Sequence, residues 1–136
     1  MMEVRTALVG CLSVALMACS GGTTPTNPGG VFQYPQQPPA GNPVASASVD
    51  VIDFAFSPAS VSLSVGGSVT WTWVGSGHSV TSDGPPSFSP NAPVSNPPKT
   101  LGPVVFSATG DYQYYCSVHG GAGGYGGSML GTIFVR

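Results

Sequence analysis

The sequence has little charge of either sign. Three Lys or Arg and five Asp or Glu among 136 residues give a net charge of −2. Beyond the N-terminal segment the charged residues are Asp50, Asp53, Asp83, Asp111, Lys99 and Arg136. There is no basic stripe that could follow a phosphate backbone, so nucleic acid is not expected as a partner. So sparse a pattern also argues against strong electrostatic steering, and any docking surface should be apolar or polar but neutral.

The N-terminus has no apolar run long enough to span a bilayer comfortably. Residues 7–17 form a short apolar stretch after Arg5, which suits an export signal. The following "LMAC" resembles a bacterial lipobox, which implies cleavage before Cys19 and a lipid on its sulfur. We therefore expect a signal peptide over 1–18 and an extracytoplasmic, lipid-anchored protein, at the periplasm or cell surface. Ser20 mildly favours an outer membrane where the cell has one; the alternative is an uncleaved anchor.

Residues 19–46 lack any apolar periodicity. They are rich in Pro, Gly, Thr and Gln and nearly uncharged, so they are expected to be a disordered linker that follows the lipidated Cys19. The remaining residues, 47–136, are expected to form one small domain with a single core.

The candidate domain lacks a helical period. Apolar and polar residues alternate over 52–56, 61–65 and 69–73, with the period of half-buried strands. The first alternation places Ile52, Phe54 and Phe56 on one face. A glycine pair at 66–67 is expected to form a turn. Further strands are expected in the segments "TLGPVVFSA", "GDYQYYC" and "LGTIFVR". This pattern predicts an all-β, antiparallel Greek-key β-sandwich of about seven to eight strands.

Histidine and cysteine are scarce in the candidate domain, which contains two histidines and one cysteine. Cys116 has no partner within the mature chain, and His119 follows it by three residues. His78 follows the Trp-rich strand, and Met129 ends a glycine-rich loop. Two imidazoles, a thiolate and a distant thioether form the donor set of a trigonal site with a weak axial ligand, which selects one copper ion for electron transfer.

These segments resemble the cupredoxin family, which includes plastocyanin, amicyanin and azurin. "GDYQYYCSVH" is similar to the family's Y-x-C-x-x-H, and "MLGTIFV" to its Met-x-Gly-Thr ending. The resemblance implies His78, Cys116 and His119 as equatorial copper ligands and Met129 as the axial one; whether the Gly77 carbonyl contacts the metal is left open. Two departures stand out. Family members often have Asn where this chain has Ser79, and the glycine-rich loop here is longer than in the short-loop members.

Bracing of the cysteine loop, which Asn performs in those members, is therefore expected from Ser79, with Ser117 and Thr81 as candidates to share it. Asp53 is expected to be solvated or to form a turn. Trp71 and Trp73 are expected to pack in the core and keep water from the metal.

The sequence therefore predicts a type 1 copper protein that carries single electrons between a redox donor and an acceptor. These partners are expected to dock transiently near His119, the membrane is expected to be contacted through the lipid only, and the protein is expected to be a monomer. A copper-binding or delivery lipoprotein and a metal-free structural sandwich remain as alternatives. An enzyme is not expected, because a second copper site would need histidines from another subunit, and a nucleophilic Cys116–His119 pair lacks an orienting third group.

Overall fold

A computed structural model describes residues 32–136 of the chain. The signal peptide expected over 1–18 and the lipidation expected at Cys19 lie outside the described residues. The elements are β1 (Val44–Ile52), β2 (Ala55–Ser57), β3 (Ser60–Trp73), β4 (His78–Asp83), β5 (Ala92–Ser95), β6 (Thr100–Phe106), β7 (Gly110–Tyr115), a 3₁₀ turn η1 (Ala122–Gly124) and β8 (Leu130–Val135).

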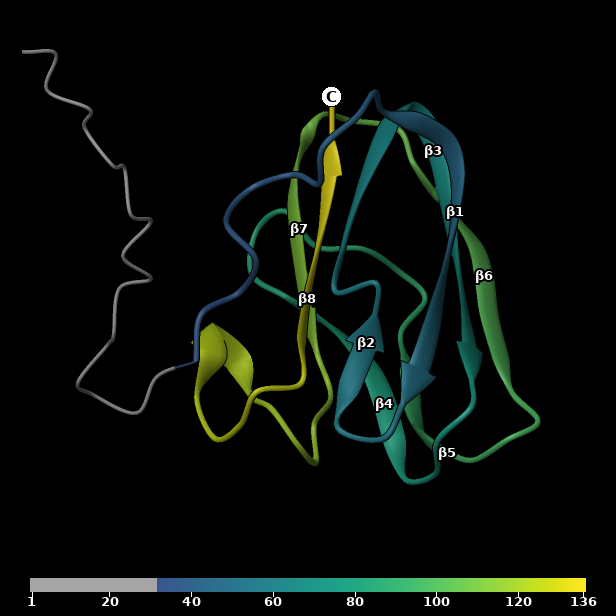
Figure 1. The fold of residues 1–136 in the computed structure, drawn as a ribbon, viewed down its shortest axis with the longest axis vertical. Helices are drawn as coiled ribbons and strands as arrows, with labels where there is room; N and C mark the ends of the chain where they lie inside the picture. The colour runs from purple at the N-terminus through teal and green to yellow at the C-terminus, as the bar shows by residue number, and fades with distance from the viewer. Residues whose placement is uncertain (1–31) are drawn as a thin grey trace, which may run out of the picture.

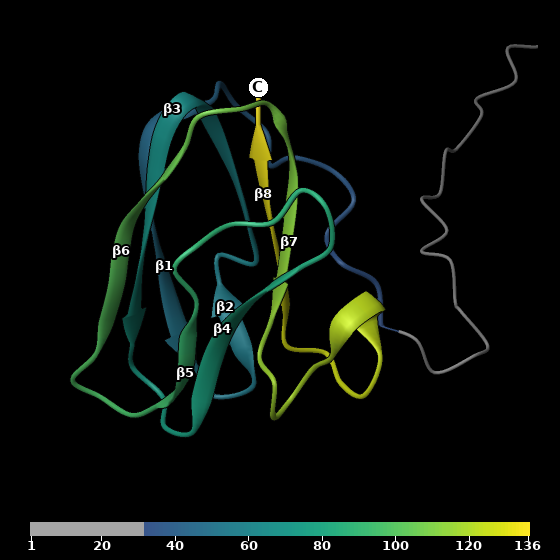
Figure 2. The ribbon, with the colours of Figure 1, turned by 180° about the vertical axis from the view of Figure 1, so that it is seen from behind.

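The strands form two packed faces around one core, which confirms the predicted all-β sandwich (Figures 1 and 2). Neighbouring strands follow the order β2-β1-β3-β8-β7-β4-β5, and β6 pairs with β3. The pairing is mixed and not antiparallel throughout as predicted, because β1 and β8 both run parallel to β3. The short β2 reverses the chain between β1 and β3, so β3 returns in the direction of β1.

The glycine pair at 66–67 bends a strand instead of ending it, which corrects the predicted turn. β3 continues through both residues for 14 residues in all. Its first part pairs with β8 and its second part with β1 and β6. Gly66 has a φ of +83°, and a Cβ on Gly67 would lie 2.8 Å from the carbonyl oxygen of Ser64. Glycine at both positions therefore lets one strand serve both faces of the sandwich.

The alternation over 52–56 was predicted to form one strand, and this prediction is wrong. Ile52 pairs with Ala55, so Asp53 and Phe54 form a tight turn between β1 and β2. Phe54 has a φ of +62° and is 64% exposed. Phe54 therefore does not share the buried face of Phe56, which is 3% exposed.

The core is aromatic and aliphatic. Trp71 is fully buried, stacks on Phe88 with ring centroids 5.4 Å apart, and meets Tyr114 edge to face at 5.5 Å. Trp71 and Trp73 lie on the buried face of β3, as predicted, and belong to one core cluster with Cys116. This cluster extends from the middle of the sandwich to the end where Cys116 lies.

The described part of the expected linker makes contact with the domain. β1 begins at Val44, three residues before the expected boundary at 47. Tyr34 is 5% exposed, and Phe32 donates its backbone amide to the carbonyl of Gly124 at 3.1 Å. Within residues 32–136, no helix has the length and apolar character needed to cross a membrane.

Candidate metal centre

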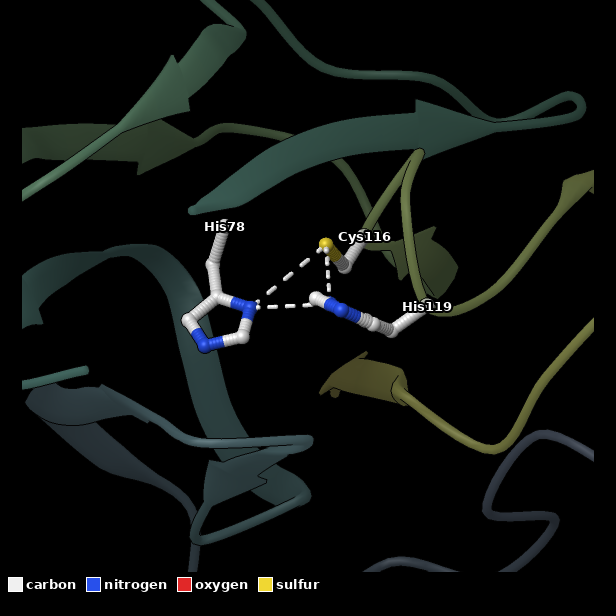
Figure 3. Close-up of side chains that lie close together, drawn as sticks. All are labelled: His78, Cys116 and His119. Carbon is white, nitrogen blue, oxygen red and sulfur yellow. Dashed lines mark hydrogen bonds between the residues drawn. The ribbon is translucent and has the colours of Figure 1, made fainter. Parts of the chain in front are cut away.

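Strand pairing brings the sequence-predicted residues to one end of the sandwich. His78 is the first residue of β4, and Cys116 directly follows the last residue of β7. β4 and β7 are antiparallel neighbours, with Thr81 opposite Tyr115. The beginning of one strand therefore lies beside the end of the other, and His119 turns back from the next loop toward both side chains (Figure 3).

Three ligand atoms form a compact triangle. Nδ1 of His78 lies 3.1 Å from Nδ1 of His119. Sγ of Cys116 lies 3.9 Å from Nδ1 of His78 and 3.7 Å from Nδ1 of His119. Both imidazoles thus turn the same ring nitrogen toward the sulfur (Figure 3).

The triangle fits a single first-row transition metal ion. An ion about 2.0 Å from each nitrogen and about 2.3 Å from the sulfur, in a planar trigonal arrangement, would separate the nitrogens by about 3.5 Å and the sulfur from each nitrogen by about 3.7 Å. The observed separations of 3.1, 3.7 and 3.9 Å are close to these values. Two imidazoles and a thiolate suit copper in both oxidation states, and they also suit zinc.

The site is buried on one side and open on the other. Cys116 is fully buried and His78 is 1% exposed, whereas His119 is partly exposed. The indole Nε1–H of Trp73 donates to the backbone carbonyl of His78 at 2.8 Å. The large side chains of the core thus exclude water behind the sulfur, and His119 offers the route to the surface.

Hydroxyl groups brace the cysteine loop, as predicted from Ser79. Oγ of Ser79 accepts the backbone N–H of Ser117 at 2.8 Å and lies 3.0 Å from its hydroxyl and 3.1 Å from that of Thr81. The backbone N–H of Ser79 donates to Sγ of Cys116 at 3.4 Å. The three predicted residues therefore share the bracing, and the Ser79 N–H would also support the sulfur as a metal ligand.

The loop between His119 and Met129 closes through backbone hydrogen bonds. Met129 N–H donates to the carbonyl of His119 at 3.1 Å, and the carbonyl of Met129 accepts from Cys116 N–H at 3.1 Å. A Cβ on Gly127 would collide with the carbonyl of His119, and one on Gly120 would lie 2.8 Å from the carbonyl of Met129. Met129 is fully buried, and these bonds place it beside the candidate ligands Cys116 and His119. Its role as the axial ligand stays a prediction.

A segment that sequence reasoning left in the linker holds this loop from outside. We call residues 32–36 the strap. The hydroxyl of Tyr34 donates to Oδ2 of Asp83 at 2.6 Å, and the same oxygen accepts Gly123 N–H at 2.6 Å. Burial and the hydrogen bond to Asp83 raise the pKa of Tyr34 well above its usual range. The strap therefore joins the end of β4 to the 3₁₀ turn of the loop.

Two residues of the β1–β2 turn also reach the site. Oδ1 of Asp53 lies 3.2 Å from Nε2 of His78. The ring of Phe54 meets His119 edge to face, with centroids 4.8 Å apart. Sequence reasoning predicted neither contact, because the alternation around these residues indicated a continuous strand.

The comparisons with known proteins give matches to solved structures only. The sequence matches no protein-family model and no curated protein significantly. A Cu(I) structure of a mutant amicyanin has a TM-score of 0.54 at 20% identity, and the match covers 68% of this chain and 83% of that one. A mutant plastocyanin of fern, known in oxidized and reduced forms, has a TM-score of 0.50 at 25% identity and covers 66% of this chain and 100% of that one.

A third similar structure is that of a larger protein. The copper-containing nitrite reductase from Thermus scotoductus SA-01 matches with a TM-score of 0.51 at 24% identity, over 74% of this chain but only 25% of the reductase. The similarity therefore concerns one part of that enzyme.

Amicyanin and plastocyanin are built on the same sandwich, and this chain has that cupredoxin fold. Within it, His78, Cys116 and His119 form a possible copper site.

Proposed function

We propose that this protein is a type 1 copper protein that carries single electrons between extracytoplasmic redox partners. The observation that carries the proposal is the triangle of Nδ1 of His78, Nδ1 of His119 and Sγ of Cys116. The cupredoxin fold supports it, because the same fold occurs in the oxidized and reduced plastocyanin structures. Met129 is proposed as the axial ligand.

Copper bound at this site supplies one-electron chemistry by alternating between Cu(II) and Cu(I). The protein's own residues hold the donor atoms in place for both states. Ser79 N–H donates to the sulfur at 3.4 Å, and the Ser79 hydroxyl fixes the start of the following loop at 2.8 Å. A site that keeps its geometry during the change of charge needs little rearrangement, and electron transfer is then fast.

The electron is proposed to enter and leave through His119. This ligand is partly exposed, whereas the other two of the triangle are buried. Two exposed apolar residues adjoin it: the ring of Phe54 meets that of His119 with centroids 4.8 Å apart, and Val118 directly precedes it in the chain. A small, nearly uncharged patch suits brief encounters with a donor and then an acceptor. The carrier itself transforms no substrate.

The location is part of the same proposal. A lipid on Cys19 and a linker would anchor a monomeric domain outside the cytoplasm and let it reach partners away from the membrane surface. Cys116, the one cysteine among residues 32–136, is buried, so its thiol would be shielded from the oxidants of such a compartment.

Copper titration of the purified full-length protein tests the proposal. We expect one equivalent of Cu(II) to give an intense visible band from thiolate-to-copper charge transfer, which disappears on reduction and returns on oxidation. Cys116→Ser should remove the band, and Met129→Ala should keep it with an altered spectrum. A matched control, Ser128→Ala, changes an exposed residue beside Met129 and should leave the spectrum unchanged.

The other functions give different results in the same titration. Binding without the visible band would favour copper holding or delivery, and no binding would favour a structural sandwich. Metal content alone does not decide, because zinc accepts the same donors.

A further inference from the structure

The β1–β2 turn lies against both candidate imidazole ligands. Asp53 and Phe54 are its two turn residues, since Ile52 pairs with Ala55. Phe54 adopts a left-handed conformation, with a φ of +62°. For a residue other than glycine this conformation is unfavourable, and it persists where the surrounding contacts determine it. The turn contacts both rings: Asp53 lies against His78, and Phe54 meets His119 edge to face at 4.8 Å and His78 at 6.2 Å.

The two ring nitrogens of His78 have separate partners. Nδ1 belongs to the triangle, at 3.1 Å from Nδ1 of His119, whereas Nε2 lies 3.2 Å from Oδ1 of Asp53. A neutral imidazole that offers the lone pair of Nδ1 to a metal must carry its proton on Nε2. Nε2–H therefore donates, and the carboxylate accepts.

The backbone is arranged so that this carboxylate can approach. The N–H groups of Val74 and Gly75 both donate to the carbonyl of Val51, at 3.0 and 2.9 Å, which holds the segment after β3 against the end of β1. A Cβ on Gly75 would collide with Oδ1 of Asp53 and would lie 2.7 Å from its backbone nitrogen. The absence of a side chain at position 75 thus makes room for the oxygen that His78 contacts.

The two partners of this hydrogen bond differ in exposure, which limits how strongly the charge of Asp53 acts on the site. The His78 side chain is 1% exposed, but that of Asp53 is 72% exposed. Water and salt therefore screen the charge of the carboxylate, whereas the hydrogen bond acts directly on the buried ring. An acceptor on the outer nitrogen of a ligand imidazole fixes its tautomer and orientation and makes the inner nitrogen a stronger donor.

We propose that Asp53 is a positioning residue of the metal centre, which holds His78 in the Nε2–H tautomer and favours the oxidised form of the bound copper. The part that concerns copper rests on the proposed function. The part that concerns the tautomer does not, because the hydrogen bond joins two side chains of the protein itself.

The hydrogen bond is tested first on the metal-free protein, at a fixed pH above the range where free imidazole is protonated. Nitrogen-15 spectra of the His78 ring should show a proton on Nε2 that exchanges slowly with water. In Asp53→Ala that proton should exchange about tenfold faster or more, because its acceptor is replaced by water. Asp50→Asn is the matched control: it removes the same charge from an exposed residue of β1 that has no side-chain contact with His78. It should leave the exchange unchanged.

The reduction potential is the second readout. In Asp53→Ala, the affinity for Cu(II) relative to Cu(I) should fall about tenfold, which raises the potential of a one-electron couple by about 59 mV. Asp53→Asn should raise the potential less, because the amide oxygen can still accept the hydrogen bond from Nε2–H. Gly75→Ala keeps the carboxylate but displaces it, and should also raise the potential.

The outcomes separate this inference from the proposed function. If no copper band forms, the proposed function fails, and the exchange comparison on metal-free protein still decides whether Asp53 holds His78. Equal exchange rates in the original protein and in Asp53→Ala would overturn the inference. Equal shifts of the potential in Asp53→Ala and Asp50→Asn would also overturn it, because the carboxylate would then act only as a remote charge.

Discussion

His78 and His119 offer the same nitrogen to the same site, but the chain supports them in different ways. His78 begins a strand, is 1% exposed and is tied through its carbonyl to the buried Trp73. His119 lies in a glycine-rich loop, is partly exposed, and is fixed by a backbone bond from Met129 at 3.1 Å. The domain core thus fixes the position of His78, and a loop that needs support from other segments fixes the position of His119.

The two histidines should therefore differ in how well ordered they are without metal. The buried histidine shares the stability of the whole domain, so it should keep its place in the absence of metal. The loop that carries His119 has few side chains to bury, so its order should depend on the backbone bonds, on the strap and on the metal. Changes near His78 should therefore act on global unfolding, and changes near His119 on metal affinity and local exchange.

The largest expected effect concerns the support of His78. Trp73→Ala should lower the free energy of unfolding by about 3–5 kcal/mol, because it removes a large core side chain together with the bond to the carbonyl of His78. Trp73→Phe keeps most of the packing and loses mainly that bond, so the loss should be smaller. Denaturant unfolding of the metal-free protein measures both. A loss below about 1 kcal/mol in Trp73→Ala would show that the His78 end is not part of the cooperative core.

A substitution at Gly127 should lower copper affinity more than it lowers global stability, which is the reverse of the expectation for Trp73. A Cβ there would collide with the carbonyl of His119, and shifting the loop to relieve this should cost about 1–3 kcal/mol. Because the loop follows the candidate ligand His119, we expect copper affinity to fall about tenfold or more, with a smaller change in the unfolding of metal-free protein.

Competition titrations with a copper chelator measure this effect. Ser128→Ala, the exposed neighbour in the same loop, is the control and should leave the affinity unchanged. If Gly127→Ala lowered global stability as much as Trp73→Ala, the contrast between the two regions would fail.

Sequence reasoning predicted the triangle and the end of the sandwich at which it lies. The donor types, the strand that ends at Cys116 and the resemblance to cupredoxins carried this prediction. The sequence did not predict that His78 begins a strand of its own; the antiparallel pairing of β4 with β7 is what brings His78 beside Cys116.

Asp53 lies in a turn and is largely exposed, as expected, but the contacts of this turn with the two histidines and the contacts of the strap were not predicted. Ile52, Phe54 and Phe56 alternate as in a continuous strand, and Phe is a rare residue at positive φ. Tyr34 stands alone in a Pro-rich segment, and its partner Asp83 lies 49 residues away. Both features depend on contacts that only the folded chain creates.

The smallest expected change in the free energy of unfolding concerns the strap, which holds the loop from outside. Tyr34→Phe should cost about 1 kcal/mol, because a hydrogen bond to a partly exposed carboxylate is lost. The N–H of Gly123, which shares Oδ2 of Asp83, should then exchange faster with water. Tyr114→Phe is the control: its buried hydroxyl has no hydrogen-bond partner among residues 32–136, so the change should cost little.

The stability of the folded protein should depend on pH through Tyr34 and Tyr114. In the unfolded chain both tyrosines ionise near their ordinary pKa of about 10, whereas in the folded chain burial, and for Tyr34 also the bond to Asp83, raises the pKa. Below pH 10 both states keep the proton and the stabilisation is complete. As pH rises above that value the unfolded state loses protons that the folded state retains, so stability should fall.

Tyr34→Phe and Tyr114→Phe should each make that fall less steep, but only Tyr34→Phe should begin from a lower stability at neutral pH. Denaturant unfolding at a series of pH values measures the slopes, and an unchanged slope in Tyr34→Phe would show that the strap is not held in solution.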